Sequence, residues 1–315
     1  MIYDLPVLRR ILKKQVPLIV SAVLIIAGLL LVASIYVPDQ IKKSSNLKSI
    51  TTKAKKTVLR DGPGPMYKQL ATFSNSEKLT ILKEKHGWLK VRSSIDKKTG
   101  WVASWVAEGK ANNVSKVTRM TEATIVLDPG HGGSDPGSLA IDGATDPKYF
   151  EKTYTLRTAR KIKKALESTG ARVIMTRDSD KLLWPLSKIS NISKKYHADA
   201  FISIHFDNYT VANAATGFTE YYYHKKTTNS YSLAETLKKH FNNLPLSNRG
   251  VRSGNFYVIH YTYLPSVLLE MGYLNNSNDF QYIKSASYQE AIAQDVKKGL
   301  QDWFDNVQPS LSKTK

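Results

Sequence analysis

The stretch Thr124-Ile-Val-Leu-Asp-Pro-Gly-His-Gly-Gly-Ser-Asp-Pro-Gly137 decides the fold of the larger part of the chain. Its first four residues suit a buried strand, and they run directly into a turn dense in Gly, Pro and Asp. In open α/β sheets, such a polar loop at the carboxyl end of a strand is the usual position of the chemistry. His131 is the only imidazole in this loop, and neutral imidazole is a common zinc ligand. The alternative is a tight turn in which His131 only binds a carbonyl.

The composition excludes several kinds of chemistry. The 315 residues give room for one large domain, a smaller one and appendages. There is no cysteine, so disulfides and thiolate sites are excluded, and any metal must be held by His and carboxylates. Of the net charge of +20, +13 falls on residues 40–120, which hold 18 basic and 5 acidic residues. Such a segment attracts a polyanion, which would be nucleic acid, anionic lipid or an acidic wall polymer.

Residues 16–37 form an uncharged apolar run that is long enough to cross a bilayer. Four basic residues precede it within residues 1–15 and favour a cytoplasmic N-terminus. The alternative is a signal peptide, but its apolar core is typically about 7–15 residues long and ends at a small-residue cleavage site. Here the run ends in Ile35-Tyr-Val-Pro38. We therefore expect an uncleaved transmembrane helix, a tether over residues 38–51 and a catalytic domain outside the cytoplasmic membrane; cleavage would give a secreted form.

Residues 52–108 predict a small all-β barrel. Short apolar runs separated by turn signals occur at Thr57–Leu59, Leu79–Leu82, Trp88–Val91 and Gly100–Val106. The series LRDGPGPMYKQLATF, LTILKEKHGWLKVR and TGWVASWV resembles the bacterial Src-homology-3-like module of wall enzymes, and this resemblance implies a cell-wall-binding module. We expect Trp88, Trp101 and Trp105 to be core residues rather than ligand platforms, because a small barrel needs large apolar side chains.

A polar linker over residues 109–121 leads to residues 122–307, where strand and helix patterns alternate before a polar tail at residues 308–315. The alternation predicts an α/β fold with a mainly parallel sheet flanked by helices. The predicted strands are Thr124–Leu127, Arg172–Thr176, Ala200–Ile204, Phe218–Tyr223, Phe256–Ile259 and Val267–Leu269. The predicted helices are Phe150–Thr169, Leu186–Tyr196, Tyr231–Asn242 and Tyr288–Trp303.

Three further residues are expected to join His131 at one edge of this sheet. Glu151 opens the first helix, His205 ends the strand Phe-Ile-Ser-Ile-His, and Glu270 ends the strand Val-Leu-Leu-Glu. Two histidines and a glutamate around zinc, with a water in the fourth position, form an established catalytic arrangement. A further glutamate nearby can act as base to that water and then as acid to the leaving amine.

Each of these residues also has a structural alternative. Glu151 would be an ordinary carboxylate of a first helical turn, and His205 a satisfied histidine at a strand end. Glu270 would form a salt bridge with Arg177 or Arg252. Three carboxylates near the same edge are alternative ligands: Asp128, Asp135 and Asp207. The remaining histidines of this region are expected to be structural or surface residues: His197, His224, His240 and His260.

The series TIVLDPGHGGSDPG, FEKTYTL, VIMTRDSD, FISIHFDN and LLEMGYLNN resembles, in order, the zinc-dependent N-acetylmuramoyl-L-alanine amidases of the type-3 family. The resemblance covers about residues 122–306. It implies that His131, Glu151 and His205 hold Zn²⁺ and that Glu270 is the catalytic residue. It also implies an α/β sheet flanked by helices and cleavage of the amide that joins the lactyl group of N-acetylmuramic acid to L-alanine in peptidoglycan.

The chain departs from the family pattern in two places. The helix before His205 reads PLSKISNISKKYH, without the arginine and the Ala-Asn pair of many members. Phe206-Asp207-Asn208 follows His205, where relatives often carry Asn and a small residue. Both departures concern substrate fit rather than the metal site. The loops after His131 and His205 are too short for the regulatory insertion that buries zinc in some relatives, so we expect an open cleft.

The sequence therefore predicts a membrane-anchored, wall-bound zinc amidase that acts in wall remodelling or autolysis. The alternatives are a zinc peptidase that cuts a stem-peptide bond and a non-catalytic wall-binding protein, which would lack a ligand or Glu270. The expected partners are peptidoglycan, anionic wall polymers and the cytoplasmic membrane. Nucleic acid is not an expected partner, because the apolar run argues against a cytoplasmic location for the basic segment.

Overall fold

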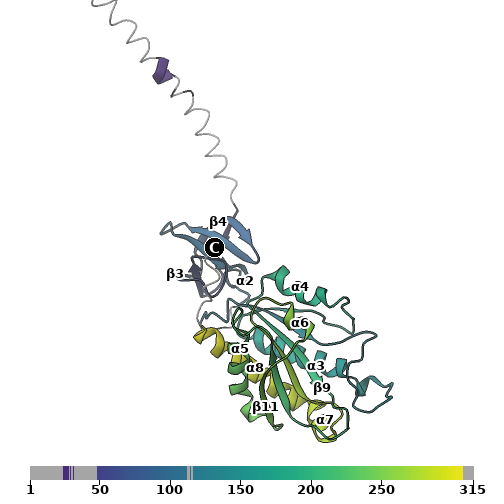
Figure 1. Ribbon diagram of the computed structural model, residues 1–315. Coiled ribbons are helices and arrows are strands. Elements are labelled where there is room, and N and C mark those ends of the chain that lie inside the picture. Colours follow the sequence, from purple (N-terminus) through teal and green to yellow (C-terminus); the bar gives the residue numbers. More distant parts are fainter. Residues whose placement is uncertain are drawn as a thin grey trace, which may run out of the picture. The chain divides into compact units, whose positions relative to one another are not determined.

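The computed structural model describes residues 24–27, 29, 31, 48–111, 114 and 116–307 (Figure 1). The chain divides into two units, Met1–Ser49 and Ile50–Lys315. Most of the predicted transmembrane run therefore lies outside the described residues, although the six that are described within it are helical. In the described part of the chain, no helix is both long and apolar enough to cross a membrane.

The small module is a six-stranded sheet. Its strands are β1 Ser49–Thr51, β2 Lys56–Arg60, β3 Gln69–Ser74, β4 Lys78–Lys85, β5 Trp88–Ser93 and β6 Thr99–Ala103, in the spatial order β1-β4-β5-β6-β2-β3. Alternate residues such as Leu59, Leu79 and Val91 point into an apolar core, as the period of two requires. The predicted strand at Gly100–Val106 is wrong in its second half, because the helix α2, Ser104–Ala107, begins directly after β6.

The tryptophans of the module have the predicted structural role. Trp88 and Trp105 are buried, and the half-buried Trp101 packs against the same apolar cluster. The indole N–H of Trp105 donates to the carbonyls of Thr121 and Gly170, each at 3.1 Å. A buried indole needs such an acceptor. The prediction of core residues is thus confirmed for Trp88 and Trp105.

A buried ion pair joins the module to the segment that precedes the larger sheet. The Arg60 guanidinium contacts the Glu122 carboxylate, and both side chains are almost inaccessible. Burial raises the pKa of Glu122 to about 7, although the charge of Arg60 opposes this shift. Met120 and Thr121, at the end of the predicted linker, are also buried. The end of the linker is therefore packed structure.

The larger sheet also has six strands. They are β7 Thr124–Pro129, β8 Arg172–Met175, β9 Ala200–Asp207, β10 Phe218–Tyr222, β11 Asn248–Ser253 and β12 Ser266–Tyr273, in the order β11-β10-β12-β9-β7-β8. All neighbouring strands are parallel except β10 and β12, which are antiparallel. The sheet is therefore mixed, with the predicted parallel character in most of its pairs. All of β7 is buried, as expected for a strand covered on both faces.

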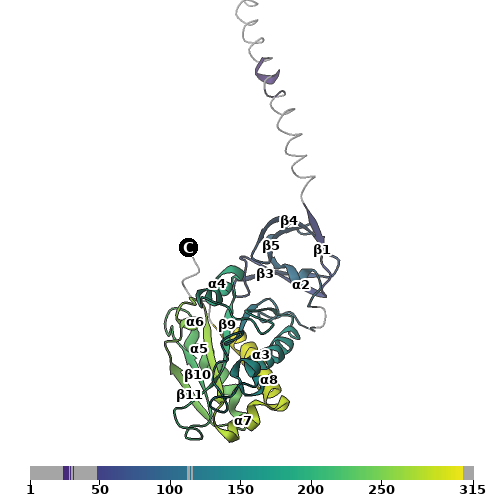
Figure 2. The same cartoon turned by 90° about the vertical axis from the view of Figure 1, so that its right-hand side faces the viewer.

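Helices cover the two faces of this sheet unequally. The helices are α3 Glu151–Glu167, α4 Ser187–Tyr196, α5 Ser230–His240, α6 Tyr257–His260, α7 Ser277–Ile283 and α8 Ala286–Asn306, with short 3-10 helices η1 Pro147–Tyr149 and η2 Phe241–Asn243. Ile125, Ile202 and Leu269 pack with α3, α5 and α8 on what we call the closed face. Val126, Phe201 and Leu268 pack with α4 and α6 on the open face. Figure 2 shows α3 and α8 side by side.

Three elements differ from the sequence prediction. The predicted strand Phe256–Ile259 is instead the single helical turn α6, because an apolar run this short fits a buried strand or a buried helix equally well. Strand β11 was not predicted, since its sequence, Asn-Arg-Gly-Val-Arg-Ser, is polar and lies at the sheet edge. Helix α7 was also not predicted. Its N-cap residue, Asn276, accepts hydrogen bonds from the backbone N–H groups of Asn278 and Asp279.

Candidate metal centre and catalytic cleft

The structure brings together the three residues predicted as metal ligands. His131 lies in the loop after β7, Glu151 is the first residue of α3, and His205 lies on β9. One potential ligand atom from each side chain lies within 4.8 Å of the other two. The Glu151 carboxylate is 3.0 Å from Nε2 of His131 through one oxygen and 3.0 Å from Nδ1 of His205 through the other. Among the described residues, His131, Glu151 and His205 form the group of His, Cys, Asp or Glu side chains whose donor atoms could hold a metal ion.

Glycine is required at two positions around this group. A Cβ at Gly130 would lie 2.1 Å from Cε1 of His205, and a Cβ at Gly137 would lie 2.6 Å from an oxygen of Glu151. Gly137 also has a φ of +70°, which side chains other than glycine adopt rarely. Any larger residue at Gly130 would displace His205, and any larger residue at Gly137 would displace Glu151 or His131. The glycine-rich turn after β7 thus makes room for the imidazole and carboxylate groups.

Neighbouring groups orient the three side chains. Asp135 Oδ2 lies 2.8 Å from Nδ1 of His131, which directs Nε2 of that ring toward Glu151. The backbone N–H groups of Ser138 and Phe206 donate to the Glu151 carboxylate, at 2.8 and 3.0 Å. Such outer contacts set the tautomer and direction of metal ligands. The predicted alternative ligand Asp135 therefore contacts His131 and lies outside the group of three.

The other two alternative carboxylates have different partners. Asp128 is buried and accepts hydrogen bonds from the hydroxyls of Thr176 and Ser203, both at 2.7 Å. Asp207 accepts from the backbone N–H of Asn208. Neither belongs to the group that is arranged to hold a metal. These contacts give Asp128 a structural role between β7, β8 and β9.

The four histidines predicted to be structural or surface residues also lie outside this group. His240 pairs with Asp302 at 3.1 Å, and His224 Nε2 lies 2.7 Å from the carbonyl oxygen of His260. His197 is the left-handed C-cap residue of α4. The two histidines that contact Glu151 are therefore His131, in the loop after β7, and His205, near the end of β9.

The donor set fits a divalent zinc ion. Burial disfavours the charged forms of both His131 and Glu151. Even so, the hydrogen bond to Glu151 and the charge of Glu151 raise the pKa of His131 to about 9. The hydrogen bonds from His131 and His205 likewise hold the pKa of the buried Glu151 carboxyl below its usual range. Glu151 is thus an anionic oxygen donor between two imidazole rings, and a metal that binds here would displace the proton of His131. Nitrogen and carboxylate donors of this kind, open to a fourth ligand, are those that catalytic zinc uses.

Glu270 lies beside the metal group without belonging to it. Its Cα pairs with that of His205 across β12 and β9, so both side chains project from the open face. The side chain is half-buried, and its buried Oε2 has no hydrogen-bond partner. Burial, followed by the charges of Glu151 and Asp207, raises the pKa of Glu270 well above its usual range. Arg177, its predicted alternative partner, instead donates to the carbonyls of Pro129 and Gly130.

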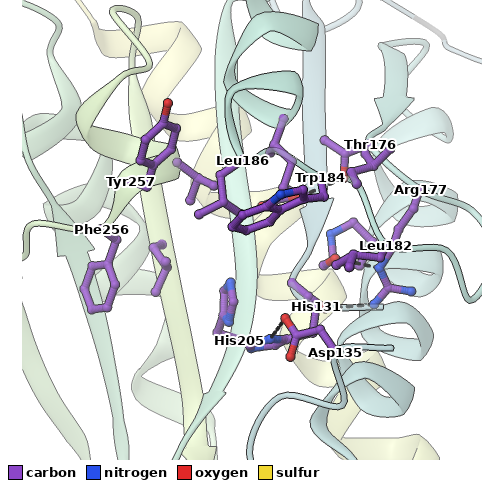
Figure 3. A pocket seen from close by; sticks show the side chains of 17 residues that line it. His131, Asp135, Thr176, Arg177, Leu182, Trp184, Leu186, His205, Phe256 and Tyr257 are labelled. Carbon is purple, nitrogen blue, oxygen red and sulfur yellow. Dashed lines mark hydrogen bonds and ion pairs between the residues drawn. The ribbon is translucent and has the colours of Figure 1, made fainter. Parts of the chain in front are cut away.

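A cavity of about 260 Å³ adjoins the two histidines on the open face (Figure 3). One wall comes from the loop after β8 and the start of α4, with Leu182, Trp184 and Leu186. Phe256 and Tyr257, before and within α6, form the opposite wall. The sequence reasoning missed these walls. One sequence feature could have indicated the first wall. It is the run Leu182-Leu-Trp-Pro185, which is apolar within an otherwise polar loop.

Comparison with known proteins assigns the family. Residues 125–302 match the family model described as N-acetylmuramoyl-L-alanine amidase. This chain belongs to that amidase family. The amidase also matches the bacterial SH3 domain over residues 56–107, as the module's sequence predicted. Its cell-wall amidase activity and its α/β catalytic fold are therefore established by membership and structure together.

Similar proteins match both the whole amidase and its catalytic domain. The probable cell wall amidase LytH of Staphylococcus epidermidis is 36% identical over 251 residues, which cover 79% of this chain and 82% of that protein. The catalytic domain of CwlV from Bacillus (Paenibacillus) polymyxa var. colistinus has a TM-score of 0.54 at 32% identity, covering 58% of this chain and 98% of that chain. The CwlD amidase from Clostridioides difficile, in complex with the GerS lipoprotein, has a TM-score of 0.53 at 29% identity, with the same coverage.

Proposed function

We propose that this amidase hydrolyses the bond between N-acetylmuramic acid and L-alanine with one Zn²⁺ held by His131, Glu151 and His205, and with Glu270 as the proton-transfer residue. The observation that carries the proposal is the approach of three donor atoms within 4.8 Å of one another, beside a carboxylate oxygen that has no protein partner. Membership of the amidase family supplies the bond that is cut.

Each chemical requirement of the reaction has a group in the cleft. Amide hydrolysis breaks the C–N bond, forms a C–O bond to water, and moves one proton from that water to the leaving alanine nitrogen. The chemistry that a bound Zn²⁺ supplies is Lewis-acid polarisation of the carbonyl and of the water. Glu270 accepts the proton of the water at its unpartnered oxygen and then delivers it to the nitrogen. Burial raises the pKa of Glu270, which favours the protonated form that donates to the leaving nitrogen.

The decisive experiment is mass analysis of the products released from purified peptidoglycan by the full chain. We expect glycan strands with free lactyl carboxyl groups and peptides with new alanine amino termini. A chelator should abolish this release, and added Zn²⁺ should restore it. Products in which L-alanine is still attached to muramic acid would identify a stem-peptide peptidase and reject the proposal.

A pair of matched histidine variants tests the metal ligands. His131→Ala and His205→Ala should lose most of the zinc, because two remaining donors cannot close the site. His240→Ala is the control, since that histidine pairs with Asp302 and lies outside the metal group. Full zinc content in both site variants would show that other residues are the ligands.

We infer from the sequence that residues 16–37 hold the enzyme in the cytoplasmic membrane, with the catalytic domain in the wall. The support is the uncharged run and the basic residues before it. Protease added outside intact protoplasts should then degrade the chain beyond the anchor. Recovery of only a soluble form that lacks residues 1–37 would identify a signal peptide instead.

We also infer that the basic module contributes to wall binding through anionic wall polymers. The support is its match to the bacterial SH3 domain and the +13 charge of residues 40–120. Sedimentation of the full chain with purified wall should weaken with salt, since the screening length falls from about 10 Å at 0.1 M to about 3 Å at 1 M. Binding that does not depend on salt would exclude the anionic polymer as its ligand.

A further inference from the structure

Exposed tyrosines continue the wall of the catalytic cavity outward along one segment. Residues 256–263 read Phe-Tyr-Val-Ile-His-Tyr-Thr-Tyr. Val258 and Ile259 are buried, whereas Tyr257, Tyr261 and Tyr263 are 39%, 49% and 73% exposed. Tyr257 itself lines the cavity that contains the two histidine ligands. We refer to Tyr257, Tyr261 and Tyr263 as the aromatic track, which begins at the catalytic centre.

The rings of the aromatic track are held in place by their neighbours. The centroids of Tyr257 and Tyr261 are 4.5 Å apart, and Tyr261 stacks on His260 at 4.4 Å with an angle of 3° between the planes. Tyr263 lies 5.0 Å from His224, whose Nε2 contacts the carbonyl of His260. Rings that are ordered before binding lose little side-chain entropy when a ligand arrives. An exposed aromatic surface of this kind marks an interaction site.

Trp184 supplies a further ring across the cavity from Tyr257. Its side chain is 65% exposed, and Figure 3 shows it above His131 and His205, with Tyr257 on the opposite wall. Trp184 and Tyr257 therefore line the cavity itself, and Tyr261 and Tyr263 continue from Tyr257 along the same segment. Their faces are apolar, and each tyrosine also carries a hydroxyl at its edge.

The charged groups that line the cavity are already engaged by protein. Asp128 accepts hydrogen bonds from two hydroxyls, Asp135 contacts His131, and Arg177 donates to backbone carbonyls. The walls therefore offer aromatic and aliphatic surface rather than an uncommitted charge. Such a surface suits a neutral ligand. In peptidoglycan, the stem peptides carry free carboxylates, whereas the glycan strand is uncharged where its lactyl groups are amidated.

We propose that Trp184 and the aromatic track bind the glycan strand of peptidoglycan, so that this enzyme recognises several consecutive sugars rather than one muramoyl residue. The proposal rests on the amidase function proposed above. One face of a pyranose ring presents C–H groups that pack on the negative face of an aromatic ring. Trp184 and Tyr257 contact the sugar at the cleaved bond, and Tyr261 and Tyr263 contact the sugars beyond it.

The test compares two substrates with the same peptide on the full chain. One is N-acetylmuramoyl-L-alanyl-D-isoglutamine, which has a single sugar, and the other is a glycan strand of at least four sugars. We expect kcat/KM to favour the long substrate by about tenfold, as one or two aromatic contacts would give. Tyr261→Ala combined with Tyr263→Ala should bring the ratio of the two kcat/KM values close to one.

Control variants separate loss of binding from loss of folding. Tyr231→Ala removes a half-buried tyrosine at the start of α5, which covers the closed face, and should leave the ratio unchanged. Tyr261→Phe keeps the ring and should keep the preference. Tyr263→Ala alone removes the most exposed ring and should lower the ratio partly.

Two results would overturn the proposal. The first is equal cleavage of the two substrates by the unaltered enzyme. The second is a double variant that folds normally and retains the full preference, which would assign the aromatic track to another partner such as a protein. Failure to cleave either substrate would instead refute the amidase function itself.

Discussion

The two faces of the catalytic sheet are covered by different helices. One face holds the apolar core that stabilises the fold, and the other holds the side chains of the candidate catalytic site. On the closed face, α3, α5 and α8 bury an apolar layer that includes Ile204 and Phe206. On the open face, the 10-residue α4 and the 4-residue α6 leave His205 beside the cavity. Because side chains alternate along a strand, adjacent residues of β9 project to opposite faces: Ile204 and Phe206 into the core, and His205 toward the cavity. Substitutions should therefore affect either activity or stability, according to the face on which they lie.

The largest effect is expected at Glu270 on the open face. Glu270→Gln keeps the shape of the side chain but removes the oxygen that transfers the proton. We expect the release of alanine amino groups from peptidoglycan to fall by about 10²–10⁴, with folding and zinc content unchanged. Assays of released amino groups and of bound zinc check this together.

The outcome also distinguishes the roles available to Glu270. Near-normal turnover would mean that another group transfers the proton. Loss of zinc would mean that Glu270 is a ligand. Glu220→Gln is the matched control, because Glu220 lies on β10 opposite Leu269 and projects from the closed face. That control should keep its activity.

A cavity on the closed face should affect stability alone. Phe241, in η2, is fully buried and packs edge-on against Phe218 at 5.9 Å. Phe241→Ala should lower the free energy of unfolding by about 3–5 kcal/mol, because large buried rings leave cavities that collapse only in part. Urea denaturation measures the loss. Turnover measured well below the unfolding transition should stay near normal, and a selective loss of turnover would contradict the separation of the faces.

We expect the free energy of unfolding to depend on pH through Glu220, which lies on the closed face. Its side chain is fully buried, and burial raises its pKa to about 7, although Asn248 donates a hydrogen bond to it. A raised folded-state pKa means that the stabilisation is complete below the unfolded value of 4.5 and is lost as pH rises through 7. The loss is at most about 3–4 kcal/mol, from about 1.4 kcal/mol per pKa unit. Urea denaturation at pH 5 and pH 8 should show a smaller decrease for Glu220→Gln than for the unaltered chain. If the free energy of unfolding decreased equally in the two proteins between pH 5 and pH 8, Glu220 would not be the cause of the pH dependence.

The smallest effect is expected from the group that orients His131. Asp135→Asn keeps a hydrogen-bond acceptor near Nδ1 but removes the charge, and we expect zinc affinity to fall by about 10–100-fold. Competition with a chelator measures the change. Asp302→Asn is the matched control, since Asp302 contacts His240 outside the metal group at 3.1 Å. Equal affinities in the two variants would show that Asp135 has no role in metal binding.

The sequence predicted the central strands and the meeting of His131, Glu151 and His205, because both depend on local patterns. Strands β7, β9 and β12 are apolar runs that end in a polar residue or turn, so their carboxyl ends could be placed at one edge. The positions of His131 and His205 at this edge follow from where β7 and β9 end. The order of strands was not predicted, and the antiparallel neighbour of β12 came only from the structure.

Features that depend on exposure were not predictable from the sequence. The run Phe256–Ile259 has the composition of a strand, but only the packed fold shows that Val258 and Ile259 face inward while Tyr257 faces the cavity. Strand β11 is polar because it lies at an edge, and its pairing depends on β10. The predicted membrane anchor lies mostly outside the described residues, so it stays a prediction.

The position of β12 has a consequence for how the enzyme acquires its activity. Among the described residues, this strand is the last along the chain, yet it lies between β9 and β10. Until Ser266–Tyr273 is inserted, the sheet is in two pieces, and the carboxylate of Glu270 is absent from the cleft. On the role proposed above for Glu270, a chain that ends before Ser266 would lack the proton-transfer residue and would have no hydrolase activity. The proposed catalytic group is therefore complete only when β12 has joined the strands on either side of it.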